Sequence, residues 1–135
     1  MNYKRVFAAA VFAIFGIGLM SCGQSDKSVD NELAQMVLEE NKDLPTTLGD
    51  KTRLDSITAL PGRKIQYNCT IINTRINMIH AESFKKLVGP TLLLGVKRDP
   101  SLESYRRKKV TFIYNYQNEA GEEIAVFEYT PEDYK

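Results

Sequence analysis

The chain has 135 residues, with 18 Lys and Arg against 17 Asp and Glu, and a formal net charge of +1. Such a balance provides no overall attraction for nucleic acid or for anionic lipid. One histidine and two cysteines exclude a zinc site with the usual ligands. About a hundred residues follow the N-terminal segment, enough for one modest core, and we predict a single domain over residues 29–135.

The N-terminal segment is typical of a secretory signal. Lys4 and Arg5 supply positive charge, and residues 6–20 form an uncharged, mainly apolar run. This run is short for a permanent transmembrane helix. We therefore predict that residues 1–21 are a signal peptide that is removed from the mature protein.

The four residues Leu19-Met20-Ser21-Cys22 resemble the lipobox of bacterial lipoproteins. The resemblance implies cleavage before Cys22, diacylglycerol on its thiol, and acylation of the new amine by chains such as palmitate. Several buried acyl chains would hold the protein on a membrane. Gly23 replaces the Asp that retains enteric lipoproteins at the inner membrane, which implies the outer membrane, facing the periplasm. A plain signal peptide with a chance cysteine and an uncleaved signal anchor remain as alternatives.

The first part of the mature chain predicts a tether followed by a helix. The lipidated Cys22 and the small polar residues up to 28 predict a flexible tether over 22–28. Apolar residues then recur at helical spacing over 29–41, with Ser28 as the N-cap. Pro45 ends this pattern.

A β-hairpin is predicted over residues 52–60 and 64–72, joined by a turn at Pro61-Gly62. The alternation of the first strand places four residues on one face: Leu54, Ser56, Thr58 and Leu60. Ile57 then falls on the opposite face, which indicates that part of the outer sheet face is covered.

The middle of the chain returns to helical spacing over 74–88. Gly89-Pro90 breaks or kinks this helix, and the apolar segment 91–96 fits either a strand or a helix. Asp99 and the following Pro100 mark the start of a short helix that ends in basic residues.

A second hairpin is predicted over 110–116 and 123–130, with a turn at 118–121. These elements predict an α+β fold, with one antiparallel sheet of about four strands and helices packed on one face. The block from Thr52-Arg53-Leu54-Asp55 to Tyr114-Asn115-Tyr116 is similar to small exported bacterial domains of no assigned activity.

No residue pattern predicts catalysis. His80 lies alone within the expected second helix, and an arrangement with Ser83 and Asp55 lacks the motif that marks a nucleophilic serine. Cys69 alternates with apolar residues, which predicts a buried, inert thiol. We expect no catalytic residue, no metal and no cofactor.

Two features predict binding. Four cations at the end of the short helix fit an anionic partner, or complement the helix dipole. Tyrosines of the second hairpin offer broad contact area, which we expect on the exposed face of the sheet. The candidate binding residues are Arg106, Arg107, Lys108, Lys109, Tyr114 and Tyr116.

These observations favour a membrane-anchored, non-catalytic module that binds an envelope protein, an anionic lipid or a polymer, and not nucleic acid. An alternative is a structural or assembly lipoprotein of an envelope or secretion machine. A small envelope hydrolase that uses His80 or Cys69 is a third hypothesis.

Overall fold

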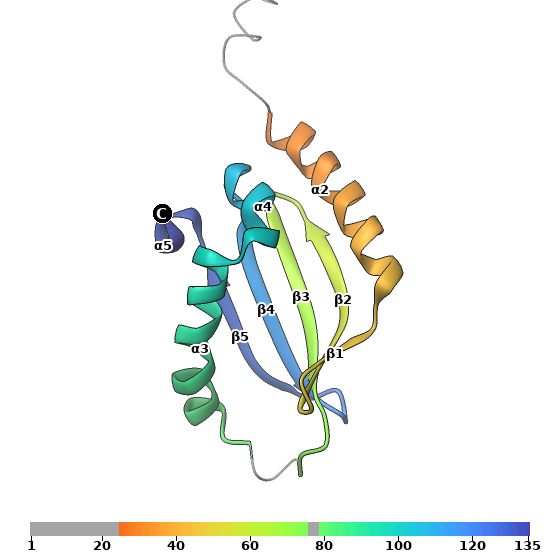
Figure 1. The fold of residues 1–135 in the computed structure, drawn as a ribbon, viewed down its shortest axis with the longest axis vertical. Coiled ribbons are helices and arrows are strands. Elements are labelled where there is room, and N and C mark those ends of the chain that lie inside the picture. The colour runs from red at the N-terminus through yellow and green to blue at the C-terminus, as the bar shows by residue number, and fades with distance from the viewer. Residues whose placement is uncertain (1–24, 76–78) are drawn as a thin grey trace, which may run out of the picture.

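The structure, a computed structural model, describes residues 25–75 and 79–135. The predicted signal peptide, Cys22 and the start of the tether lie outside the described residues. One five-stranded sheet in the order β1-β2-β3-β4-β5 forms the centre of the domain (Figure 1). The strands are β1 (Thr46–Leu48), β2 (Thr52–Leu60), β3 (Lys64–Ile71), β4 (Thr111–Asn118) and β5 (Glu123–Tyr129). The helical elements are α2 (Asp26–Glu40), η1 (Asn41–Asp43), α3 (Ala81–Arg98), η3 (Pro100–Leu102), α4 (Glu103–Arg107) and α5 (Pro131–Tyr134).

The sheet is mostly antiparallel, but its central pair is parallel. β3 and β4 run in the same direction, from Lys64 opposite Thr111 to Ile71 opposite Asn118. Parallel neighbours need a crossover connection, which α3, η3 and α4 supply. The α+β class is confirmed. The expected four-stranded, wholly antiparallel sheet is wrong, because β1 adds a strand and β3 pairs with β4 in parallel.

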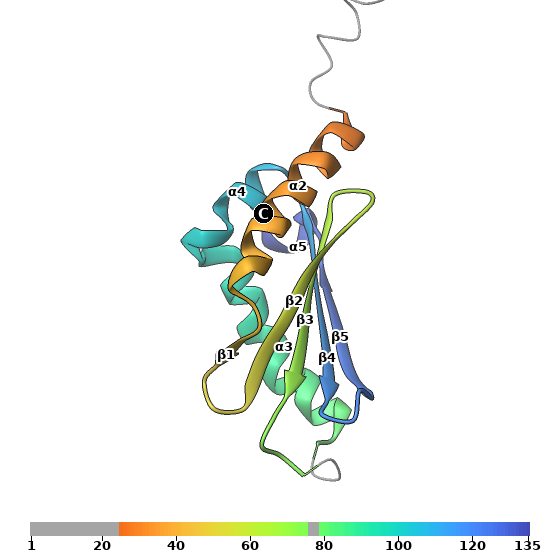
Figure 2. The same ribbon diagram turned by 90° about the vertical axis from the view of Figure 1, so that its right-hand side faces the viewer.

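The helices lie on one face of the sheet (Figure 2). Helix α2 packs against β2, and α3 packs against β5. Within residues 25–75 and 79–135, fifteen buried apolar residues form the core: Val29, Leu33, Val37, Ile57, Ile65, Tyr67, Cys69, Ile71, Val96, Tyr105, Val110, Phe112, Tyr116, Ala125 and Phe127. Among the described residues, no helix is long and apolar enough to cross a membrane.

A β-bulge in β2 changes which residues face the core. Leu54 pairs with Cys69, but the next pair joins Ser56 to Asn68, so Asp55 is the extra residue. Each residue after the bulge therefore lies on the face opposite to the one that simple alternation predicts. Ile57 is buried in the core, whereas Ser56 accepts a hydrogen bond from the Asn68 amide at 3.1 Å on the polar face. The predicted face of Leu54, Ser56, Thr58 and Leu60 is thus wrong beyond Leu54.

Helix α2 begins earlier than the sequence predicts. The Ser25 hydroxyl accepts a hydrogen bond from the backbone N–H of Ser28 at 3.3 Å, and the helix starts at Asp26. Ser25, not Ser28, is therefore the N-cap. Residues 26–28 belong to the helix, which shortens the predicted tether.

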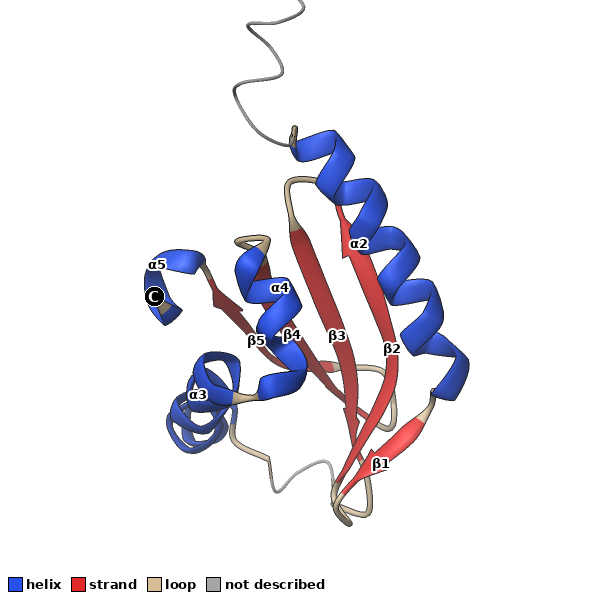
Figure 3. Ribbon diagram, turned by 45° about the horizontal axis from the view of Figure 1, so that its top comes forward, coloured by secondary structure: helices blue, strands red, loops and turns tan. Residues whose placement is uncertain are grey.

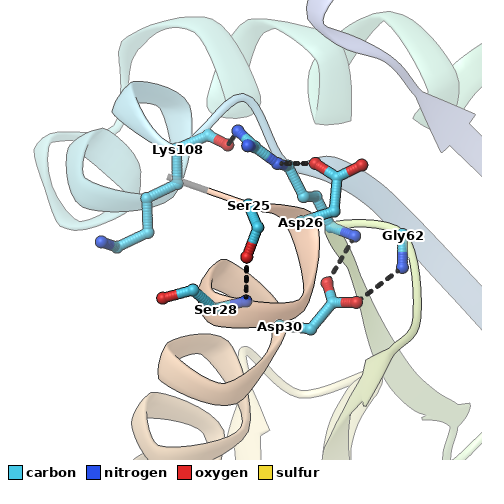
Figure 4. Close-up of polar contacts among 7 residues, drawn as sticks. Ser25, Asp26, Ser28, Asp30, Gly62 and Lys108 are labelled. Carbon is cyan, nitrogen blue, oxygen red and sulfur yellow. Dashed lines mark hydrogen bonds and ion pairs between the residues drawn. The ribbon is translucent and has the colours of Figure 1, made fainter. Parts of the chain in front are cut away.

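Polar contacts join the start of α2 to the turn between β2 and β3 (Figure 4). The Asp30 carboxylate accepts hydrogen bonds from the backbone N–H groups of Gly62 at 3.0 Å and Arg63 at 2.7 Å. The Arg63 side chain donates from Nε to Asp26 at 2.6 Å and from a terminal nitrogen to the Lys108 carbonyl at 3.0 Å. These contacts hold the first helix, the turn and the segment before β4 together.

Replacing Asp30 with alanine is expected to lower the free energy of unfolding by about 1–2 kcal/mol, because two turn N–H groups lose a charged acceptor. Urea unfolding followed by circular dichroism measures this loss. The matched control is Asp43→Ala, which removes a carboxylate from an exposed residue of η1. Equal stability losses in the two variants would contradict the proposed role of Asp30.

Helix α3 is one continuous helix from Ala81 to Arg98 that includes Pro90. The segment 91–96, which the sequence left undecided, is helical, and the helix begins later than the expected residue 74. Contacts with β5 hold this region. A Cβ at Gly89 would lie 3.3 Å from the Phe127 ring, and the Tyr129 hydroxyl donates a hydrogen bond to the Gly89 carbonyl at 2.7 Å.

Candidate binding groove

A groove opens on the helix-covered face of the sheet, and its lining includes residues of α2 and α3. Figure 3 shows how these two helices lie over the sheet. Its volume is about 470 Å³. The central strands form its floor, and the ends of α2 and α3, with β1 and η3, form its sides. The lining residues are mainly apolar or aromatic: Glu40, Leu48, Leu54, Ile57, Tyr67, Cys69, Leu92, Asp99, Ser101, Leu102, Tyr114 and Tyr116.

The groove exists because the helix layer does not cover the whole sheet. Helix α2 lies over β2 and α3 lies against β5, and three strand spacings of about 4.8 Å separate these two strands. The short helix α4 occupies the space between α2 and α3 at one end only (Figure 3). Toward the other end, Leu54, Cys69 and Tyr116 of the strands line the groove.

Stacked aromatic rings form the centre of the floor. Tyr67 of β3 and Tyr114 of β4 lie side by side, with ring centroids 4.9 Å apart and planes 12° apart. Cys69 and Tyr116 continue the same two strands. Burial raises the pKa of the Cys69 thiol to about 12, so the thiol stays protonated at neutral pH. The predicted burial of Cys69 is confirmed.

The hydroxyl of Tyr67 is buried and has no hydrogen-bond partner among the described residues. Burial raises the pKa of this hydroxyl far above its ordinary range, with a smaller contribution from Tyr114. A buried polar group without a partner is unfavourable by about 1–3 kcal/mol. Such a group in a native protein calls for an explanation.

Of the described residues that line the groove, two are carboxylates and none is a cation. Glu40, at the end of α2, accepts a hydrogen bond from the Tyr105 hydroxyl. Asp99 accepts hydrogen bonds from the Ser101 hydroxyl at 2.7 Å and from its N–H at 2.9 Å. These bonds lower the pKa of Asp99. The groove thus combines an apolar floor with a negative rim.

A family model described as a domain of unknown function, DUF8479, matches residues 28–125, which include the whole lining of the groove. The chain belongs to the DUF8479 family. No curated protein matches this DUF8479 sequence.

Three solved structures share the fold of this DUF8479 chain. A Pseudomonas aeruginosa protein described as secreted is 15% identical, with a TM-score of 0.68 over 84% of this chain and 100% of that one. A type 2 secretion system pilotin from Vibrio vulnificus is 9% identical, with a TM-score of 0.62 over 82% and 94%. A type II secretion system pilotin from Vibrio cholerae is 13% identical, with a TM-score of 0.62 over 80% and 94%. At these identities the similarity shows a common fold alone.

The structure separates the two predicted groups of binding residues of the DUF8479 domain. Tyr114 and Tyr116 line the groove, so they lie beneath the helix layer and not on the bare face of the sheet. The predicted basic residues Arg106, Arg107, Lys108 and Lys109 do not line it.

Three of these four cations have partners within the domain. Arg106 donates hydrogen bonds to the carbonyls of Val96 at 2.9 Å and Asp99 at 2.8 Å. Arg107 lies 3.4 Å from Glu103, and Lys108 forms an ion pair with Glu32 of α2. These contacts hold α4 against its neighbours, which is the structural alternative to an anionic ligand.

The candidate catalytic residues do not form a site in the described part of the DUF8479 domain. The sequence predicts His80 inside a helix over 74–88, but the observed helix α3 begins at Ala81, so His80 lies just before it. The His80 side chain makes no capping hydrogen bond to α3. Asp55 bonds to Arg53 and Thr70 at the β2 bulge, and no hydrogen bond joins it to His80 or Ser83. Within the described residues, no three His, Cys, Asp or Glu side chains are placed to hold a metal ion.

Sequence reasoning missed most of the apolar lining of the groove. Leu48 lies on the unpredicted strand β1, Leu92 on the segment that the sequence left undecided, and Leu102 in η3. Leu48 is 54% accessible, and the sequence alone does not predict this exposure because it does not predict β1.

Proposed function

We propose that this DUF8479 protein is a lipid-anchored protein of the bacterial envelope, and that it acts as an assembly factor by binding an apolar helical segment of another envelope protein. The open groove in the helix layer is the observation that carries the proposal. Two of the similar structures are pilotins of type II secretion systems, which supports an assembly role over a general binding module. The partner is then a component of an envelope secretion machine.

The shape of the groove favours a short helix as its occupant. An α-helix is about 10 Å wide with its side chains, and α4 already occupies one end of the same space. A volume of about 470 Å³ accommodates a few apolar side chains. The occupant would therefore extend the helix layer from the end of α4 and bury its apolar face on the tyrosine floor.

The rim defines the charge of the occupant. Because Glu40 and Asp99 are the charged residues of the lining, Lys or Arg beside the apolar face would complement the groove. We also propose that the protein is not an enzyme, since His80, Ser83 and Asp55 are not joined in one site.

Photo-crosslinking in the native host tests whether the groove binds an envelope protein, with Leu48 as the test position and Leu38 as its control. A photo-crosslinking amino acid at Ser101, an exposed residue of the lining, should form a discrete adduct with one envelope protein. Leu48→Glu should reduce that adduct at least about tenfold, since it places a charge in an apolar contact. Leu38→Glu should leave it intact, because Leu38 is equally exposed, at 59% against 54%, but does not line the groove.

Adduct yield is measured by blotting at equal protein levels. If Leu48→Glu and Leu38→Glu gave the same yield, the groove would not be the binding site. Absence of any specific adduct from Ser101 in the unmodified background would contradict the proposed function itself.

A further inference from the structure

The outer side of α3 exposes leucines to solvent. Leu87 is 77% accessible, the highest value among the large exposed apolar residues, and Leu94 is 48% accessible. Seven positions separate them, which is about two helical turns, so they share one side of the helix. Pro90, between them, is also exposed. Leu92 of the same helix lines the groove, so the exposed leucines and the groove lie on different sides of α3.

Three cations lie on the same side of α3 as these leucines, or next to it: Lys86, Lys97 and Arg98. All three are exposed, and none forms an ion pair with a described residue. Residues 83–98 contain no Asp or Glu. This arrangement contrasts with Arg107 and Lys108, whose charges are paired within the domain. The charge on α3 is therefore available to an external anionic surface.

The proposed anchor places this helix near a membrane. Ser25, the N-cap of α2, follows Cys22 by three residues, which span at most about 11 Å when fully extended. Helix α3 runs toward the end of the molecule at which α2 begins (Figure 1). Lys97 and Arg98 are at that end of α3. A lipid on Cys22 would therefore hold at the membrane the end of the molecule toward which Lys97 and Arg98 lie.

We propose that the outer side of α3 rests on the anionic phospholipid surface that holds the lipid anchor, with Leu87 and Leu94 inserted and Lys86, Lys97 and Arg98 against the headgroups. Exposed Leu beside Lys and Arg is the pattern of helices that lie in a membrane interface. This proposal rests on the proposed lipid anchor, but not on the occupant of the groove. The groove side of α3 stays free for a partner while the other side is on the membrane.

The test uses tryptophan as a depth reporter, since the chain contains none. Mature, lipidated Leu87→Trp protein is reconstituted into vesicles of phosphatidylethanolamine and phosphatidylglycerol, or of phosphatidylcholine alone, with brominated acyl chains. In the anionic vesicles we expect a blue-shifted emission and about twofold quenching, since interfacial helices bury their apolar side to the acyl boundary. In phosphatidylcholine we expect neither change. The vesicles contain no partner protein, so a contact with lipid is measured directly.

Leu38→Trp is the matched control, because Leu38 is an exposed leucine of α2. It should remain unquenched in both vesicles. Adding Lys86→Glu and Lys97→Glu to the Leu87→Trp protein should abolish the quenching while the protein stays on the vesicles through its lipid.

Three outcomes would overturn the proposal. Unquenched emission from the Leu87→Trp protein in anionic vesicles would show that α3 does not contact lipid, and its outer side would then be free for a protein. Equal quenching in the Leu38→Trp and Leu87→Trp proteins would show that the contact is not specific to α3. Failure of the mature protein to float with either vesicle would contradict the proposed lipid anchor. Flotation therefore separates an error about the anchor from an error about the contact of α3 with lipid.

Discussion

Replacing Asn41 with leucine is expected to lower the free energy of unfolding by about 2–4 kcal/mol. The Asn41 amide donates to the Ile57 carbonyl, and its oxygen accepts from the Ile57 N–H, both at 2.8 Å. Strand β1 pairs with β2 only as far as Thr46, opposite Leu54, so the edge of β2 beyond the bulge has no neighbouring strand. The Asn41 side chain makes the hydrogen bonds to Ile57 that such a strand would make. Leucine would leave two backbone groups of a buried residue unsatisfied.

Chemical unfolding monitored by circular dichroism measures this effect. Asn41→Asp keeps the acceptor for the Ile57 N–H but loses the donor, so its loss should be intermediate. Asn31→Leu makes the same replacement at an exposed position of α2 and should change stability by less than about 0.5 kcal/mol. A loss at Asn31 equal to that at Asn41 would argue against the hydrogen bonds as the cause.

Alkaline unfolding is the second large effect that we expect. Burial raises the pKa of the Cys69 thiol from 9.0 to about 12, and it raises those of four tyrosine hydroxyls well above 10.0. These tyrosines are Tyr67, Tyr105, Tyr114 and Tyr116. The unfolded chain releases these protons near the ordinary pKa values, whereas the folded chain retains them. Stability is therefore unaffected below about pH 9 and falls as the pH rises above it.

For each group that stays protonated in the folded state, the free energy of unfolding falls by about 1.4 kcal/mol for every pH unit above the pKa of that group in the unfolded chain. Several such groups together approach the stability of a typical small domain, about 5–15 kcal/mol, so we expect unfolding near pH 11. Tyrosinate absorbance and circular dichroism should change together in a pH titration. Tyr67→Phe should move this transition to higher pH, because it removes one buried ionisable group. Complete ionisation of all the tyrosines near pH 10 in a protein that stays folded would contradict the expectation.

The sequence predicts local structure here better than it predicts pairing. Alternation places Phe112, Tyr114 and Tyr116 on one face of β4, but it does not show that helices cover this face, where Phe112 and Tyr116 are buried. The bulge at Asp55 cannot be read from alternation, because it exchanges the two faces within one strand. The parallel pairing of β3 with β4 also has no local signal, since it joins strands that are far apart in the chain.

The sequence predicts only part of the groove lining, because most of the lining residues come together through contacts between distant elements. Tyr114 and Tyr116 follow from the alternation of one strand, and both line the groove. Leu48, Leu92 and Leu102 come from three separate elements, and they converge only because the helix layer leaves part of the sheet uncovered. The basic residues around Arg106 form an evident group in the sequence, but their partners lie on other elements.

The parallel central pair also dictates the order in which the polypeptide can acquire its structure during synthesis. Thr70 and Gln117, which are hydrogen-bonded across β3 and β4, are 47 positions apart, so this ladder cannot close until almost the entire polypeptide has been made. A nascent chain that stops after α4 presents the β3 edge without its neighbour and the apolar floor without half of its residues. Translation of the last two strands is thus the event that allows cooperative folding, and C-terminal truncation should abolish the whole domain instead of trimming it.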